Sequence, residues 1–257
     1  MIKCVFFDVD GTLLSHRTGC VPASTIRALQ KLQKAGLQVM MATGRHRLEL
    51  EELPMEQFPF DGYVTLNGQL IFDRNWNLLQ EYPIVGEAKK CLIEIFDNRS
   101  VPIILVEKDQ IYINYVDDYV RKVQHDILSS VPQVGHYSGE NIFLAVAYVS
   151  KEMEKTFSEQ LTQLCVTRWH DQAIDITPAD GGKVRGIKYY LEMNGISQKE
   201  TMVFGDSEND IEMLRYAEVG VAMGNSVDAV KREADYVTAD IDNDGIWKAL
   251  VEYGLIS

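Results

Sequence analysis

The sequence lacks the features that would place this protein at a membrane or on nucleic acid. No stretch approaches the ~18 consecutive apolar residues that a membrane-spanning helix needs, and the apolar run before Asp8 is too short for a signal peptide. Basic residues are few, because 25 Lys and Arg stand against 38 Asp and Glu, a formal net charge of −13. Such a chain has no general basic face to attract nucleic acid or anionic lipid. We expect no nucleic-acid partner and no membrane partner.

Paired cysteines, internal repeats and low-complexity segments are missing as well. The four cysteines, Cys4, Cys20, Cys91 and Cys165, lie far apart, without a CxxC pair or metal-ligand spacing. This pattern is typical of reduced thiols, and it predicts a cytoplasmic protein. The content of 46% hydrophobic and 25% charged residues is that of a globular chain. At 257 residues it has room for one or two domains, and nothing in it predicts an obligatory protein partner.

The most informative stretch of the chain is close to its N-terminus. An apolar run, Val5–Phe7, leads into Asp8 and Asp10, and Gly11 and Thr12 follow. Ligands of open α/β sheets collect at the carboxyl ends of strands, where these two carboxylates are expected. Two carboxylates this close repel each other unless a cation or a proton intervenes, and Mg²⁺ prefers such ligands. The alternative is an ordinary acidic turn after a strand.

A second strand is expected to end beside the first. Residues 22–35 have the apolar spacing of a helix, and the short apolar run at 37–42 predicts a strand that ends at Thr43-Gly44-Arg45. Strand, helix and strand in this order predict a parallel pair, whose carboxyl ends share one edge of the sheet. A hydroxyl, a glycine and an arginine suit a phosphate or carboxylate ligand there, although Thr43 could equally be a helix cap.

The next segment predicts a hairpin. Apolar runs at 62–66 and 70–72 flank Asn67-Gly68, and Asn-Gly between such runs is a strong hairpin signal. Asn67 is therefore interpreted as a turn residue near the edge of the site rather than as a ligand.

From residue 82 the pattern changes to that of an α+β insert. Helical spacing near 87–97, 119–128 and 151–164 alternates with strand-like runs, two of which, 103–106 and 111–115, predict an antiparallel hairpin. The chain is expected to form a core from residues 1–81 and 181–257 and an inserted domain from residues 82–180.

Two further polar motifs follow the insert. Lys183 comes after two glycines at the start of a helical pattern, where a lysine opposes the helix dipole unless an anion site compensates. The apolar run Thr201–Phe204 leads into Gly205 and then Asp206–Asp210. The alternatives are a solvated lysine and an acidic helix cap, but the second motif supplies more acid than a cap needs.

Together these motifs resemble those of the haloacid dehalogenase (HAD) superfamily. The segments DVDGTLL, TGR, GGK and GDSEND occur in the order and with the spacing of its four motifs, over the whole chain. The large insert before the third motif is similar to that of the Cof-type subfamily IIB. The resemblance implies an α/β fold, with a Rossmann-like parallel-sheet core, helices on both faces, and an inserted α+β cap domain that selects the substrate.

The resemblance also implies roles for individual residues. Asp8 would attack phosphorus and become an aspartyl phosphate, and Asp10 would protonate the leaving oxygen and then activate water. Mg²⁺ would be bound by Asp8, by the main-chain carbonyl of Asp10 and by Asp206. The remaining motif residues have two implied roles. The phosphate-binding residues would be Thr43, Gly44, Lys183 and Asn209, and Asp210 would hold these residues in position without contacting the phosphoryl group.

Asp10 favours a phosphatase over a dehalogenase, because an alkoxide leaving group needs an acid and a halide does not. The sequence thus predicts a Mg²⁺-dependent phosphatase of small phosphorylated metabolites, with sugar phosphates as the first choice and pyridoxal phosphate or flavin mononucleotide among the possible others. Two alternatives are a phosphotransferase or phosphomutase acting on sugar phosphates, and a non-catalytic phosphate-binding regulatory domain. Receiver domains of the latter kind are shorter and lack an insert of this size.

Overall fold

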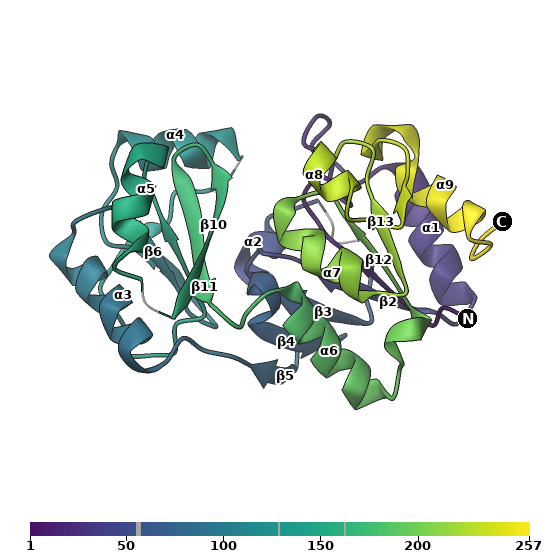
Figure 1. The fold of residues 1–257 in the computed structure, drawn as a ribbon, viewed down its shortest axis with the longest axis horizontal. Helices are drawn as coiled ribbons and strands as arrows, with labels where there is room; N and C mark the ends of the chain where they lie inside the picture. Colours follow the sequence, from purple (N-terminus) through teal and green to yellow (C-terminus); the bar gives the residue numbers. More distant parts are fainter. Residues whose placement is uncertain (55–57, 128, 162) are drawn as a thin grey trace. The chain divides into compact units, whose positions relative to one another are not determined.

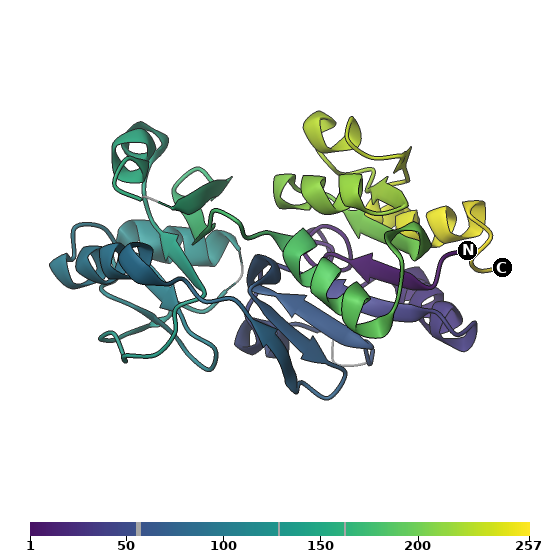
Figure 2. The same cartoon turned by 60° about the horizontal axis from the view of Figure 1, so that its bottom comes forward.

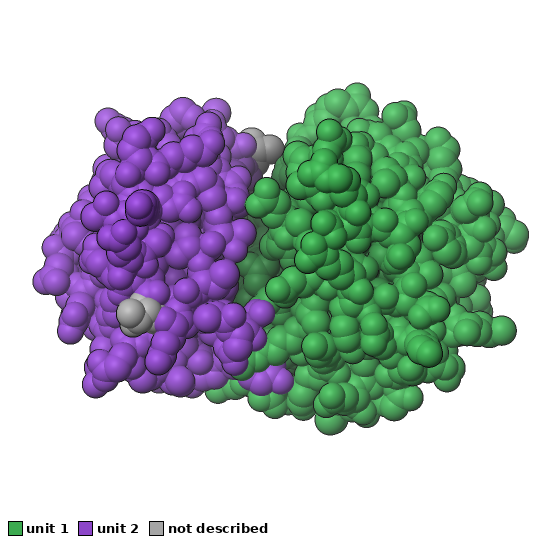
Figure 3. Space-filling model, in the orientation of Figure 1, with its two compact units in different colours: residues 1–81, 182–257 green, residues 82–181 purple. Residues whose placement is uncertain are grey.

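The structure, a computed structural model, describes residues 1–54, 58–127, 129–161 and 163–257. It divides into two compact units, shown in different colours in Figure 3. We call residues 1–81 with 182–257 the core unit and residues 82–181 the inserted unit. The second boundary lies one residue from the position that the sequence analysis gave it. None of the helices in the described part of the chain combines the length and apolar character that crossing a bilayer requires.

The core unit is built on an eight-stranded sheet in the order β14-β13-β12-β1-β2-β3-β4-β5. Six strands run parallel: β1 (Cys4–Phe7), β2 (Gln38–Ala42), β3 (Gly62–Thr65), β12 (Thr201–Gly205), β13 (Val219–Ala222) and β14 (Tyr236–Val237). The last two strands in the order are antiparallel to their neighbours: β4 (Leu70–Asp73) and β5 (Leu78–Glu81). The predicted parallel pair and the predicted hairpin at Asn67-Gly68 are both confirmed. The edge strand β5 was not predicted, because its sequence has no apolar alternation.

Helices cover both faces of this sheet (Figures 1 and 2). Helix α1 (Ala23–Lys34) packs with α9 (Gly245–Glu252), while α6 (Lys183–Asn194) packs with α7 (Ile211–Tyr216). Helix α1 buries Ala28, Leu29 and Leu32, which three- and four-residue spacing places on one side. The shorter helices are α2 (Arg47–Glu51) and α8 (Asp228–Lys231). The α/β fold with helices on both faces is as predicted.

Strand β1 lies at the centre of the sheet and forms its switch point. The chain leaves β1 toward β2 and β3 on one side and later returns to β12 and β13 on the other. Phe6 and Phe7 are fully buried, and the Phe7 ring stacks on Phe204 of β12 with ring centroids 4.9 Å apart. In such sheets the crevice at the carboxyl ends of the strands beside the switch point is where ligands bind.

The inserted unit has its own sheet and its own core. Its six strands are in the order β10-β11-β9-β6-β7-β8: β6 (Ile103–Val106), β7 (Ile111–Ile113), β8 (Gln133–Val134), β9 (Leu144–Ala147), β10 (Leu164–His170) and β11 (Ala173–Pro178). The helices are α3 (Gly86–Asn98), α4 (Asp118–Asp126) and α5 (Lys151–Ser158). The predicted hairpin of β6 and β7 is confirmed. Helix α5 is shorter than predicted, because its apolar pattern continues into β10; of the predicted helical ranges, residues 128 and 162 lie outside the described residues.

Candidate active site

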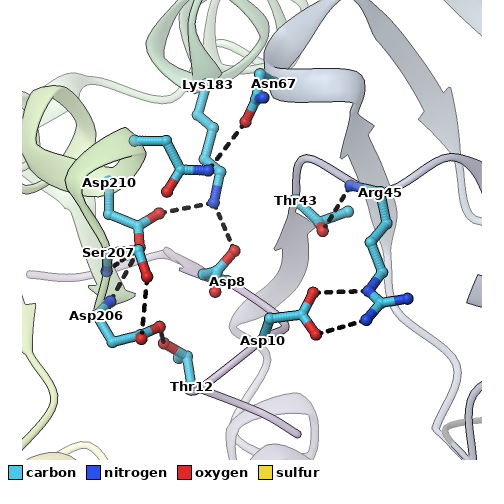
Figure 4. Close-up of polar contacts among 11 residues, drawn as sticks. Asp8, Asp10, Thr12, Thr43, Arg45, Asn67, Lys183, Asp206, Ser207 and Asp210 are labelled. Carbon is cyan, nitrogen blue, oxygen red and sulfur yellow. Dashed lines mark hydrogen bonds and ion pairs between the residues drawn. The ribbon is translucent and has the colours of Figure 1, made fainter. Parts of the chain in front are cut away.

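The four sequence motifs meet at the carboxyl edge of the core sheet. Asp8 directly follows β1, Thr43 follows β2 and Asp206 follows β12, and Lys183 is the first residue of α6. Figure 4 shows their side chains gathered in one place, although they come from positions up to about 200 residues apart. The motifs lie together because parallel strands all end at the same edge of the sheet, so the residues that follow them are neighbours.

Lys183 is the buried cation at the centre of the site. Its ammonium group lies 2.5 Å from Asp8 Oδ1 and 2.6 Å from Asp210 Oδ1, and the residue is only 1% exposed. Gly182, with φ of +112°, precedes it, and the Gly182 N–H donates to the carbonyl of Asn67. This turn fixes where α6 begins. The lysine is therefore not a solvated side chain, and its two carboxylate partners offset its unfavourable place at a helix N-terminus.

Asp210 orders the loop after β12. While its Oδ1 accepts from Lys183, its Oδ2 accepts from the backbone N–H groups of Asp206 (2.9 Å) and Ser207 (3.0 Å). The side chain is fully buried. Because both oxygens are engaged in this way, Asp210 fixes Asp206 and Lys183 relative to each other.

Asp206 is held by hydroxyl groups that the sequence analysis had not singled out. Thr12 Oγ1 donates to Asp206 Oδ1 at 3.0 Å, and Ser207 Oγ donates to Oδ2 at 3.1 Å. Gly11 has φ of +81°, and a Cβ at this position would lie 2.3 Å from Asp206 Oδ2. Asn225 also donates to the Gly11 carbonyl at 2.8 Å. Gly11 and Thr12 are therefore needed to position Asp206: Gly11 leaves room for its carboxylate and Thr12 donates to it. No local sequence pattern indicates that Asn225 contacts this loop.

Asp10 points to a different partner from Asp8. The Arg45 guanidinium donates from Nε to Asp10 Oδ2 at 2.7 Å and from Nη2 to Oδ1 at 2.8 Å, a bidentate pair (Figure 4). Such a pair fixes both the position and the plane of the carboxylate. The sequence predicts an anionic ligand beside Arg45, and in the structure the anion that Arg45 contacts is the Asp10 carboxylate.

The remaining predicted residues line the same edge. Thr43 is 1% exposed, and its Oγ1 accepts from the Arg45 N–H at 3.1 Å. Asn67 adopts a left-handed conformation (φ 52°, ψ 41°), as a turn residue can, and its Oδ1 accepts from Asn209 Nδ2 at 3.1 Å. A Cβ on Gly44 would lie 3.2 Å from this Asn67 oxygen. Asn67 is therefore both the predicted turn residue and a neighbour of the site.

Burial and an excess of carboxylates shift the ionisation of the site. Burial raises the pKa of Asp8 well above its ordinary value, and Lys183 only partly opposes this. Burial, with the charge of Asp210, raises the pKa of Asp206 to about 6. Burial would lower the pKa of Lys183, but Asp210 and Asp8 outweigh it, so the net shift is upward and the lysine stays charged. An additional cation would stabilise the ionised carboxylates.

The acidic residues fit a hard divalent cation. Oxygen atoms of Asp8, Asp206 and Asp210 lie within 4.8 Å of one another. Asp210 is already engaged by Lys183 and two backbone N–H groups, which leaves Asp8 and Asp206 to offer carboxylate oxygens. An all-oxygen donor set suits Mg²⁺ rather than a metal that prefers sulfur or imidazole.

Comparison with known proteins identifies the family. The family model described as haloacid dehalogenase-like hydrolase matches residues 5–250. The chain belongs to this family. The HAD subclass IIB sugar phosphatase BT4131 is 36% identical, with a TM-score of 0.88, over 99% of this chain and 100% of that one. BT1666 of Bacteroides thetaiotaomicron, from a study of HAD phosphatases, is 32% identical with a TM-score of 0.91, over 100% of this chain and 96% of that one.

Several curated relatives of this HAD hydrolase are named as phosphatases. The pyridoxal phosphate phosphatase YbhA of Escherichia coli (strain K12) is 26% identical over 95% of this chain and 96% of its own length. The similarity thus extends over both the core unit and the inserted unit. The subclass IIB resemblance predicted from the motifs is confirmed, and the protein is a HAD phosphatase of the Cof type.

Proposed function

We propose that this HAD phosphatase hydrolyses small phosphorylated metabolites, sugar phosphates in particular, through an aspartyl phosphate on Asp8 and with Mg²⁺ as cofactor. The observation that carries the proposal is the contact of Asp8 with the buried Lys183 ammonium group. Lys183 engages one oxygen of Asp8, while the other makes no hydrogen bond within the described part of the chain. A carboxylate oriented in this way can present an oxygen to phosphorus.

Asp8 and Asp10 would divide the two half-reactions. An Asp8 oxygen forms a bond to phosphorus while the bond to the leaving oxygen breaks, and Asp10 gives that oxygen its proton. Asp10 then removes a proton from a water molecule, whose oxygen attacks phosphorus and releases inorganic phosphate and the Asp8 carboxylate. Arg45 supports the second, base half of this role, because its bidentate contact holds the ionised Asp10 carboxylate in one orientation.

The cation and the phosphoryl group would use the remaining residues. The side chains of Asp8 and Asp206 and the main-chain carbonyl of Asp10 would hold Mg²⁺, which when bound neutralises charge on the transferring phosphoryl group. Lys183 would hold a phosphoryl oxygen. The other phosphate-binding residues would be those at the edge of the site, Thr43, Gly44 and Asn209, while Asp210 keeps Lys183 and Asp206 in place.

The inserted unit would recognise the organic part of the substrate. We place sugar phosphates first, which the similarity to a sugar phosphatase supports. The similarity to a pyridoxal phosphate phosphatase makes pyridoxal phosphate one alternative substrate. All four cysteines are free thiols, which supports a cytoplasmic enzyme. We propose no obligatory protein partner.

The direct test is release of inorganic phosphate from acetyl phosphate, p-nitrophenyl phosphate and a panel of sugar phosphates. We expect turnover with millimolar Mg²⁺ and a loss of at least about 100-fold after treatment with a chelator, because the acidic site would then repel the phosphate dianion. Adding Mg²⁺ back should restore the rate. Equal turnover with and without the cation would remove Mg²⁺ from the proposal, and no turnover on any substrate would refute the hydrolase function.

A second test addresses Asp10. Asp10→Asn should lower kcat by about 10²–10⁴-fold, the usual contribution of a general acid or base. Since water activation fails as well, phosphorylated Asp8 should accumulate and be detectable by mass spectrometry of acid-quenched protein. The variant Arg45→Met should show a smaller loss, because Asp10 remains but is no longer held. An unchanged kcat for Asp10→Asn would exclude the acid and base role.

A further inference from the structure

The turn between β3 and β4 has an unusual backbone conformation. Its three residues, Leu66, Asn67 and Gly68, all have positive φ angles, of 50°, 52° and 89°. Glycine and asparagine tolerate this region, but for leucine it is unfavourable. Leu66 is nevertheless well ordered within the core, with only 1% of its surface exposed. Backbone strain of this kind is concentrated at functional sites, where the surrounding structure maintains it.

The residue that follows the turn is also in an unfavourable position. Gln69 is fully buried, and within the described part of the chain neither Nε2 nor Oε1 of its amide has a hydrogen-bond partner. Burying an amide without partners is destabilising. The turn is therefore retained for the residues that it contacts rather than for its own stability.

The backbone of the turn contacts the loops that carry Thr43 and Lys183. The Asn67 N–H donates to the Thr43 carbonyl at 3.0 Å, and the Gly182 N–H donates to the Asn67 carbonyl at 3.1 Å. Helix α6 also begins close against the turn, because a Cβ on Gly68 would lie 2.2 Å from the Gly182 carbonyl oxygen. The turn thus fixes the positions of two of the proposed phosphate-binding residues.

The side chain of Asn67 contacts a third such residue. Asn209 Nδ2 donates to Asn67 Oδ1 at 3.1 Å, the dashed line at Asn67 in Figure 4, although the two residues are 142 positions apart. Since an amide nitrogen carries two hydrogens, this bond engages one of them and fixes the direction of the other. A Cβ on Gly44 would lie 3.2 Å from the same Asn67 oxygen. The Asn67 amide therefore lies beside both the loop after β2 and the loop after β12.

We infer that Asn67 positions the residues that bind the phosphoryl group. The inference rests on the proposed function, in which Thr43, Lys183 and Asn209 contact phosphoryl oxygens. The Asn67 backbone holds the first two in place, and its side chain orients the Asn209 amide so that the second N–H can donate to the phosphoryl group. Asparagine suits both tasks, because it tolerates a positive φ and carries an amide oxygen as acceptor. Asn67 is thus a positioning residue that acts through its neighbours.

The first test removes the side chain of Asn67 and keeps its backbone conformation. In Asn67→Gly, kcat/KM should fall by about tenfold for sugar phosphates and for acetyl phosphate alike, because the phosphoryl group is common to both. The inhibition constants of inorganic phosphate and orthovanadate should rise by a similar factor. The Mg²⁺ concentration that gives half-maximal activity should not change, because other side chains hold the proposed cation ligands Asp8 and Asp206.

A double-mutant cycle tests whether Asn67 acts through Asn209. Asn209→Ala alone should lower kcat/KM, and adding Asn67→Gly should cause little further loss, because the contact between the two amides is already absent. Residues with independent roles would instead give losses that multiply. Multiplied losses would overturn the inference, since a side chain that acts through Asn209 has no effect once Asn209 is removed.

The backbone contribution needs a further variant and a control. Asn67→Ala removes the same amide but disfavours a positive φ, so it should unfold at a lower temperature than Asn67→Gly and lose more activity. Asp244→Gly is the matched control, because Asp244 is an exposed residue of the core unit with φ of 59°. It should leave all kinetic constants unchanged.

A purely structural role would give a different result. If Asn67→Gly lowered the unfolding temperature but left kcat/KM and the phosphate inhibition constant unchanged, the inference would fail while the hydrolase function stood. Failure of the wild type on every substrate would instead refute the proposed function. Circular dichroism and thermal unfolding of each variant distinguish loss of phosphate binding from loss of fold.

Discussion

Replacing Asp8 by Asn is expected to abolish phosphatase activity, with a loss of about four orders of magnitude or more, the scale seen when a nucleophile is removed. The amide is nearly isosteric with the carboxylate, but its oxygen is a poor nucleophile and cannot form a stable acyl phosphate. That amide oxygen could still accept a hydrogen bond from Lys183, whose Nζ lies 2.5 Å from Asp8 Oδ1 in the wild type. Initial rates with the best substrate of the wild type, at saturating Mg²⁺, measure this effect.

The fold of the Asp8→Asn variant should be retained. Burial raises the pKa of Asp8, so a neutral side chain at this position removes an unfavourable buried charge rather than creating one. Circular dichroism and thermal unfolding should therefore match the wild type. Asp97→Asn, an exposed aspartate at the end of α3, is the control for the substitution itself. Substantial turnover by the Asp8→Asn variant, with its identity verified by mass spectrometry, would exclude Asp8 as the nucleophile.

Replacing Lys183 by Met is expected to lower both the phosphatase activity and the free energy of unfolding. Methionine fills a similar volume but leaves Asp8 and Asp210, both buried, without the cation that lies 2.5 Å and 2.6 Å from them. Removing one partner from a buried ion pair usually costs about 3–5 kcal/mol of unfolding free energy. Loss of the phosphate-binding cation should lower kcat/KM by about 10²–10³-fold as well.

The loss of stability in this variant should depend on pH. Burial raises the pKa of Asp8 and the pKa of Asp206 in the folded protein. These two carboxylates therefore bind more protons there than in the unfolded chain, so stability falls as pH rises above their unfolded pKa of about 3.9. Urea unfolding in the presence of a chelator should show a larger deficit at pH 8 than at pH 5. Lys188→Met, an exposed lysine on the same helix, should change stability by no more than about 0.5 kcal/mol. If Lys183→Met and Lys188→Met both changed the unfolding free energy by the same small amount, Lys183 would not be the cation that stabilises Asp8 and Asp210.

Long-range pairing explains what the sequence could not predict. No local pattern indicates that Arg45 holds Asp10, because the two residues are 35 positions apart and their contact exists only after β1 and β2 pair. The hydroxyl of Thr12 reaches Asp206 across 194 positions for the same reason. The edge strand β5 could not be predicted, because it is partly exposed and its sequence does not alternate between apolar and polar residues. The length of α5 was overestimated because helical spacing and strand alternation overlap near residue 164.

The sequence alone determined the order of the motifs, the parallel pairing of the first two strands and the two-unit organisation, because hydrophobic periodicity and turn residues are local properties. Through the resemblance to the HAD superfamily, it also indicated that Asp8, Lys183 and Asp206 belong to one site. The tertiary structure decided how the charges are paired. It placed Lys183 between Asp8 and Asp210 and gave Asp10 to Arg45, since burial and distance determine which carboxylate meets which cation, and both arise only when the strands assemble.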